Sequence, residues 1–220
     1  MNTEPREGPF NEAFGDYQYV DTAIGGTDRR NNVMRVSEYE PGNRLDCFRT
    51  YCRFTEELKI DALGNVNPET GKPSVAGYPG DAVTDIVPFD FDQEGNLERA
   101  LIDARGFVRR LDAYGINANL VGVFFSGHKG FSIDVPAEVF GGFEPRPDIG
   151  EMLKSLALDL AGDLPTLDKS IYQKIRLWRT PDTKHRKSGL YKVRLSILEL
   201  YNLDLASIKG LAAAPRGGAA

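Results

Sequence analysis

The chain has 220 residues, of which 41% are hydrophobic and 27% charged, so it is long enough for one large globular domain or two small lobes. No apolar run approaches the ~20 residues of a membrane span, and the start MNTEPREGPF has no signal-peptide core, so we expect a cytoplasmic protein with no membrane partner. Two cysteines and two histidines do not supply a zinc-ligand pattern.

The net charge of −5 argues against a polyanionic partner for the chain as a whole, but this average hides a basic segment. Between Asp168 and Arg194 there are nine lysines and arginines and two acidic residues. An acidic protein with one basic segment can still bind a polyanion locally.

The N-terminal part offers few periodic signals. Residues 1–15 are polar and are expected to be flexible. Segment 46–58 alternates aromatic and basic residues and predicts a strand or short helix near the surface. Segment 64–81 is dense in glycine, proline and asparagine and predicts a loop. We expect this loop to separate an N-terminal α/β part, about 16–80, from a second part, about 81–209.

The second part shows clear hydrophobic periodicity. It predicts, in chain order, a strand at 84–92, a helix at 96–115, a hairpin of strands 118–125 and 131–136, a helix at 149–162 and a strand at 170–181. This order indicates an α+β fold containing a split, ferredoxin-like unit. Residues 210–220 are of low complexity and predict a disordered tail or a linker to a further domain.

An acidic pair ends the strand at 84–92. Side chains two residues apart on a strand point to the same face, so Asp90 and Asp92 project together. Their mutual repulsion favours a divalent cation, and oxygen-only ligands suit Mg²⁺ or Mn²⁺. The alternative is a solvated strand end without a bound ion.

Two further segments carry groups that suit phosphate. The turn FSGHKGF combines two glycines with donors on Ser126, His128 and Lys129, although it could also be a simple glycine turn. The segment LDKSIYQKIRLWR places Asp168 before Arg176 and Arg179, and arginine forks match phosphate oxygens. Carboxylates, a donor turn and arginines together favour two-metal nucleotidyl transfer.

The order of these motifs resembles the archaeo-eukaryotic primase superfamily, the primase-polymerases. Its acid-x-acid motif corresponds to VPFDFD, its Ser-x-His motif to FSGHKGF and its apolar-Asp motif to TLDKSIY. RLWRTPDTKH and KSGLYKV follow in the family's order, with PDT in place of the commoner PNS. The resemblance covers residues 85–195, and before residue 80 only FRTYCRF matches loosely.

The resemblance implies an N-terminal α/β unit packed against an RRM-like unit, with the site between them. It implies that Asp90, Asp92 and Asp168 bind two Mg²⁺ or Mn²⁺ ions and catalyse the reaction. It implies nucleotide contacts from Ser126, His128, Lys129, Arg176, Arg179, Lys184 and His185, although Arg176 could serve packing and Lys184 competes with His185 for one contact. The implied partners are single-stranded DNA template, primer, NTP or dNTP, and a helicase or primer-binding domain in the same or a partner chain.

Two other functions fit some of the same residues. A metal-dependent nuclease also needs clustered acids, but the Ser-x-His turn and the arginine pair suit a triphosphate better than a diester. A non-catalytic RRM-like module would use the basic segment and Tyr51, Phe54 and Trp178 for stacking, and it leaves the paired acids unexplained.

Overall fold

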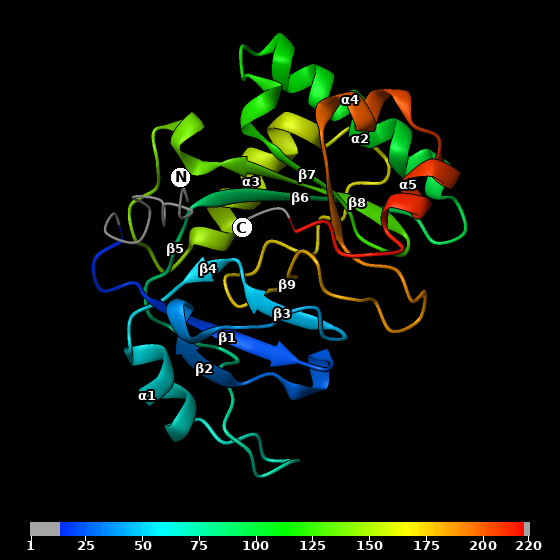
Figure 1. The fold of residues 1–220 in the computed structure, drawn as a ribbon. Coiled ribbons are helices and arrows are strands. Elements are labelled where there is room, and N and C mark those ends of the chain that lie inside the picture. The colour runs from blue at the N-terminus through cyan, green and yellow to red at the C-terminus, as the bar shows by residue number, and fades with distance from the viewer. Residues whose placement is uncertain (1–13, 218–220) are drawn as a thin grey trace, which may run out of the picture.

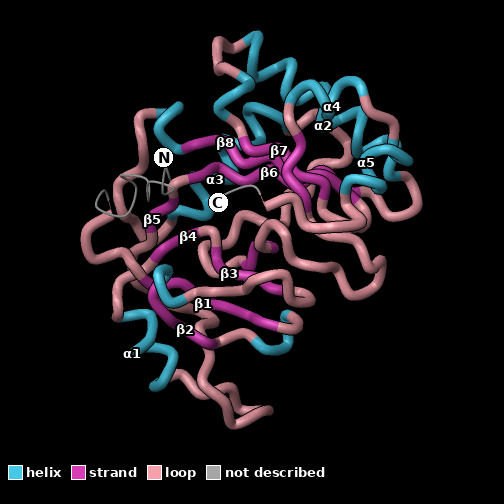
Figure 2. Tube along the Cα trace, viewed as in Figure 1, coloured by secondary structure: helices cyan, strands magenta, loops and turns pink. Residues whose placement is uncertain are grey.

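The computed structural model describes residues 14–217, and in this part of the chain the strands form three antiparallel sheets that combine with five α-helices (Figures 1 and 2). The predicted α+β class is therefore confirmed. One four-stranded sheet has the order β2-β1-β3-β9. Its strands are β1 (Tyr19–Ile24), β2 (Asn32–Arg35), β3 (Cys47–Thr50) and β9 (Leu177–Arg179).

The other four-stranded sheet has the order β10-β7-β8-β6. Its strands are β6 (Ile86–Asp92), β7 (Gly122–Phe125), β8 (Gly130–Pro136) and β10 (Val193–Leu195). A two-stranded sheet pairs β4 (Cys52–Arg53) with β5 (Val83–Thr84). In Figure 1 the sheet of β1, β2, β3 and β9 lies below the sheet of β6, β7 and β8.

Helices cover the upper face of the upper sheet, whereas α1 lies beside the lower sheet (Figure 1). The helices are α1 (Glu57–Gly64), α2 (Leu97–Ala113), α3 (Ile149–Ala161), α4 (Ile197–Asn202) and α5 (Leu205–Leu211). Short 3₁₀ turns occur at Thr27–Arg29, Val36–Glu38, Ala118–Leu120 and Ala137–Phe140. The Asn96 side chain caps α2 by accepting the Arg99 N–H, as expected for an asparagine before an amphipathic run.

Alternation along β6 decides which face meets the helices. Phe89 and Phe91 are fully buried and contact Phe107 of α2 at ring-centroid distances of 4.2 and 5.3 Å. Because neighbouring side chains on a strand point to opposite faces, Asp90 and Asp92 are turned away from α2 and toward the lower sheet. The apolar core thus fixes the direction of the acidic pair.

Most predicted elements are confirmed within a few residues. The strand at 84–92, the helices at 96–115 and 149–162, the hairpin and the loop at 64–81 are all present. The segment 118–125 begins with a 3₁₀ turn rather than a strand, because the Asn117 side chain accepts the Asn119 N–H.

The strand predicted at 170–181 is wrong in length and in place. Only Leu177–Arg179 is extended, and this β9 pairs with β3 in the lower sheet. The last strand of the upper sheet is β10, which pairs with β7 and was not predicted. The first crossover is split as expected, since β8 lies between β6 and β7.

Two other expectations need correction. Segment 46–58 is not near the surface, because Cys47, Tyr51, Cys52 and Phe54 are buried between neighbouring strands. The part of the predicted tail that the structure describes is folded: α5 runs to Leu211, Ala212 is buried, and Arg216 pairs with Glu199.

The expectation for residues 1–15 falls almost wholly outside the described residues. Among the helices of residues 14–217, none combines the length and the apolar character that crossing a membrane would require.

Candidate active site

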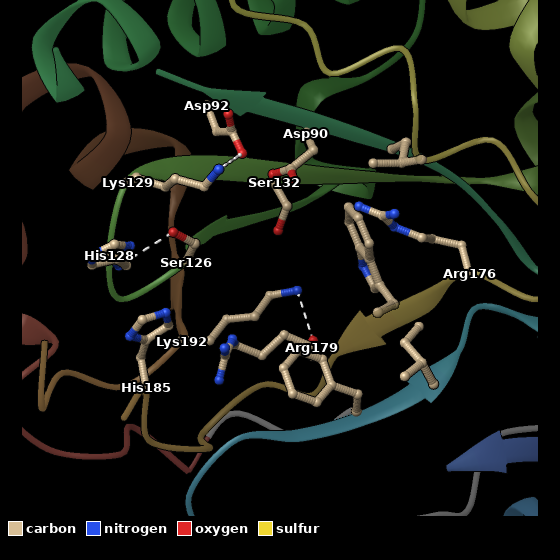
Figure 3. A pocket seen from close by; sticks show the side chains of 14 residues that line it. Asp90, Asp92, Ser126, His128, Lys129, Ser132, Arg176, Arg179, His185 and Lys192 are labelled. Carbon is tan, nitrogen blue, oxygen red and sulfur yellow. Dashed lines mark hydrogen bonds and ion pairs between the residues drawn. The ribbon is translucent and has the colours of Figure 1, made fainter. Parts of the chain in front are cut away.

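A cavity of about 180 Å³ lies between the two large sheets. Strands β3, β6, β8 and β9 and the turn between β7 and β8 contribute to its walls. Figure 3 shows acidic side chains on the upper side and basic or imidazole side chains around the rest. The cavity therefore brings carboxylates and cations together around one small space.

Asp90 and Asp92 reach this cavity from β6, and Asp168 is brought to them by the backbone. The Asp92 N–H donates to the Thr166 carbonyl at 2.9 Å, and the Asp168 N–H donates to the Asp90 carbonyl at 2.8 Å. Segment 166–168 thus lies along the edge of β6. One carboxylate oxygen from each aspartate lies within 4.8 Å of the other two.

The electrostatics of the three acids are those of a crowded, partly dry site. Burial, and then the nearby Asp92 charge, raise the pKa of Asp90 from 3.8 to about 7. The Asp92 carboxylate forms an ion pair with the Lys129 ammonium at 2.8 Å (Figure 3). The Arg176 guanidinium lies 4.0 Å from Asp168.

The donor chemistry of the three acids fits divalent metal ions. Every ligand is a carboxylate oxygen, as hard cations such as Mg²⁺ or Mn²⁺ require, and the oxygens converge from two backbone segments. A bound ion would remove the repulsion that raises the pKa of Asp90. The ligands it would use are Asp90, Asp92 and Asp168.

The turn between β7 and β8 is shaped by Ser126. Its Oγ accepts the N–H groups of His128 at 3.3 Å and Gly130 at 3.2 Å. A hydroxyl has two lone pairs and one proton, so Ser126 can contact a ligand in the cavity only as a donor. A donor suits a phosphate oxygen.

His128 and His185 both line the cavity, and their rings stack at 4.4 Å with an angle of 10° between planes. The Nδ1 of His185 accepts the N–H groups of Lys187 and Ser188, so its proton resides on Nε2. Burial, and then the charges of Arg179 and His128, lower the pKa of His185 to about 4. His185 is therefore a neutral donor at pH 7.

Arg179 lines the cavity and is held by a residue that the sequence did not point to. Its Nη1 donates to Asp46 at 2.9 Å, and its guanidinium covers the Phe48 ring at 4.5 Å. Asp46 also accepts from the side chain and backbone of Arg186. Burial opposes ionisation of Asp46, but the hydrogen bonds from Arg179 and Arg186 lower its pKa overall.

Ser132 and Lys192 also line the cavity and were not predicted as site residues. Ser132 lies opposite Asp90 in the sheet, is buried, and its Oγ has no hydrogen-bond partner among the described residues. The alternation in FSIDVP, which puts Ser132 and Asp134 on one face, is the signal that could have found it.

Lys192 is buried beside two aromatic rings. Its ammonium lies 4.8 Å from the Phe124 ring centre and 4.9 Å from that of Trp178, and it donates to the Arg179 carbonyl at 3.0 Å. Burial lowers the pKa of Lys192, while the charges of Asp134 and Asp90 oppose this shift. No local pattern distinguishes Lys192 from the other basic residues of its segment.

The cavity thus brings together most of the predicted residues, with one exception. Asp90, Asp92, Ser126, His128, Lys129, Arg176, Arg179 and His185 line it, and Asp168 joins the acids. Lys184 does not line the cavity, because its ammonium lies over the Tyr191 ring at 5.7 Å.

Comparisons with known proteins do not show a family for this chain. No family model matches the chain, and no curated protein matches it. Among solved structures, the chain is similar to the polymerase domain of Ligase D from Mycobacterium tuberculosis in complex with DNA. The TM-score is 0.46 and the identity 16%, over 76% of this chain and 59% of that chain. This chain thus spans less than two thirds of that chain's length.

Proposed function

We propose that the protein is a metal-dependent nucleotidyltransferase, and specifically a template-dependent DNA primase-polymerase that makes or extends primers from NTP or dNTP. The observation that carries the proposal is the convergence of three carboxylates, two of which line a cavity that is also lined by hydrogen-bond donors and cations suited to phosphate. We further propose that the fold is the archaeo-eukaryotic primase fold, with an RRM-like unit packed on an N-terminal α/β unit. The order of the sequence motifs supports this assignment.

Each group has a role that follows from its chemistry. Asp90, Asp92 and Asp168 would hold two divalent ions, which would lower the pKa of the primer hydroxyl and neutralise charge on the triphosphate. Lys129 and Arg179 then bind phosphate oxygens as permanent cations, whereas Ser126 and His185 donate neutral hydrogen bonds. His128 and Arg176 complete the phosphate wall.

Asp92→Ala tests the metal assignment directly. We expect incorporation of labelled nucleotide with Mn²⁺ and single-stranded DNA to fall by about 10³-fold or more, because electrostatic stabilisation of the transferring phosphoryl group is lost. The matched control is Asp112→Ala, which removes an exposed acid on α2 and should leave incorporation unchanged. Thermal melting of both variants checks folding.

The same assay separates the candidate functions. Product on unprimed template would identify a primase, and product only on primed template would identify a polymerase core that needs a primer or another domain. Shortening of the DNA without incorporation would favour a nuclease. Retained incorporation in a folded Asp92→Ala variant would refute the metal site.

A further inference from the structure

A second cavity, of about 380 Å³, also lies between the two large sheets and shares Trp178 and Arg179 with the candidate active site. Its walls include Tyr51 of the loop after β3 and Phe124 of β7. Its volume is larger than that of the active-site cavity, and nothing in the proposed chemistry uses it.

Arg49 places a positively charged hydrogen-bond donor in the wall of this cavity. It extends from β3, is partly buried and lines the cavity, and its guanidinium forms no hydrogen bond or ion pair with the residues that the structure describes. Burial lowers the pKa of Arg49, and the charge of Asp85 opposes this shift. A guanidinium carries five N–H donors, and a partly buried guanidinium without protein acceptors favours a ligand that can accept hydrogen bonds. The arrangement therefore calls for a ligand with acceptor oxygens or nitrogens.

Trp178 gives the cavity a fixed aromatic wall. Its Nε1–H donates to Asp134 at 3.2 Å, the Lys192 ammonium lies against its ring, and the Tyr51 ring packs edge-on at 6.4 Å. A side chain held from three directions is a rigid stacking surface, which lowers the entropic cost of binding a flat ligand.

The remaining charges select the kind of ligand. Asp85 is paired with Arg53 at 2.8 Å, and Asp134 accepts from Trp178, so both acids are already engaged. Arg194 lines the cavity from β10, is exposed, and forms no ion pair among residues 14–217. The cavity thus offers an interior donor, an aromatic wall and a cation at its exposed side.

We propose that this cavity binds one nucleotide of a single-stranded nucleic acid. The base lies against Trp178 and Phe124, a base carbonyl accepts from Arg49, and the phosphate meets Arg194. This proposal rests on the proposed function, because the bound strand would be the template. Trp178 lines both cavities, so the bound template nucleotide would lie next to the incoming nucleotide. Thymine and cytosine present carbonyl oxygens, the stronger acceptors for an arginine, whereas adenine has no carbonyl and offers only ring nitrogens, with its amino donor beside N1 and N7.

Trp178, the chain's only tryptophan, reports binding by fluorescence. We would titrate oligothymidylate and oligoadenylate of about eight nucleotides in EDTA, with no nucleotide present. We expect quenching by both, with oligothymidylate bound about tenfold more tightly, as befits one hydrogen bond from a charged donor. Because neither metal nor triphosphate is present, the result is independent of whether the protein catalyses nucleotidyl transfer.

Variants assign the two arginines separately. Arg49→Met should remove the preference for oligothymidylate. Arg194→Met should weaken the binding of both oligonucleotides. It should also reduce the magnitude of the slope of log affinity against log salt concentration by about one. The matched control is Arg109→Met, which removes an exposed arginine on α2. It should leave the preference for oligothymidylate and the salt slope unchanged, and it should weaken the binding of both oligonucleotides only slightly and equally.

A second measurement keeps the test decisive if Arg49→Met does not fold. Ultraviolet crosslinking of 4-thiothymidine oligonucleotides to the unaltered protein should modify peptides containing residues 49–51, 120–124 or 178. Crosslinks confined to other peptides would overturn the proposal. So would equal affinity for the two oligonucleotides, or a preference that survives in a folded Arg49→Met protein.

Discussion

Lys129 has two possible partners in the candidate active site. In this structure its ammonium pairs with Asp92 at 2.8 Å, and this hydrogen bond raises its pKa. The same turn is proposed to bind the triphosphate. A divalent ion on Asp92 would therefore displace Lys129 and leave it available for a phosphate oxygen.

Lys129→Met should separate these two roles. Without the competing ammonium, Mn²⁺ should bind the nucleotide-free protein more tightly by about threefold to tenfold, whereas triphosphate should bind more weakly. Titration of Mn²⁺ by electron paramagnetic resonance measures the first quantity, and calorimetry with nucleotide the second.

Lys169→Met is the matched control, because it removes a lysine next to Asp168 whose ammonium donates instead to the Gly162 carbonyl. Lys169→Met should change the affinity for Mn²⁺ less than Lys129→Met does. Mn²⁺ binding that is unchanged or weaker in Lys129→Met would refute the competition.

At the scale of the element, the β7–β8 turn is fixed by two glycines. Gly127 has a φ of +81°, and a Cβ there would lie 3.0 Å from the Leu190 and Tyr191 backbone. At Gly130 a Cβ would collide with the Phe91 carbonyl, because β8 starts directly beside Asp92. The turn is thus held between the acid strand and the segment before β10.

Gly127→Ala should lower the free energy of unfolding by about 1–3 kcal/mol, since both the backbone conformation and the space disfavour a Cβ. Urea denaturation measures this loss. Gly106→Ala is a control for which the opposite effect is expected. Gly106 lies in α2 with open space where a Cβ would be, so alanine there should raise the free energy of unfolding by about 0.5–1 kcal/mol. A neutral Gly127→Ala would show that the turn readjusts.

Element length decided how well each element could be predicted. β6, α2 and α3 have 7, 17 and 13 residues, enough to display a period, and all were predicted. β9 and β10 have three residues each. So short a strand displays no period, and its sheet is chosen by which edge is available, here β3 for β9 and β7 for β10.

At the scale of the whole molecule, the ionisation of Asp90 makes the free energy of unfolding depend on pH. Its pKa is 3.8 ordinarily and about 7 in the fold, so the fold favours the protonated carboxyl. This contribution is complete below pH 3.8 and disappears as the pH rises through about 7. Above that pH the metal-free fold contains a poorly solvated carboxylate beside Asp92.

We therefore expect the metal-free protein to lose stability relative to Asp90→Asn as the pH rises from about 4 to about 7. Mn²⁺ should raise the melting temperature of the unaltered protein more at the higher pH, because the ion binds the ionised carboxyl. Asp90→Asn should show a smaller Mn²⁺ effect. Scanning calorimetry at several pH values with EDTA or Mn²⁺ checks both, and parallel stability curves for the two proteins would contradict the Asp90 assignment.

The sequence by itself determined the amphipathic elements, the shared face of Asp90 and Asp92, and the turn that carries Ser126, His128 and Lys129, because all of these depend on neighbours a few residues apart. Only the tertiary structure decided that Asp168 joins the acids through the edge of β6, that Asp46 holds Arg179, and that Lys184 points away. Such contacts join residues far apart in the chain, with a sequence separation of 133 between Asp46 and Arg179. They depend on how the two sheets pack, which no local spacing specifies.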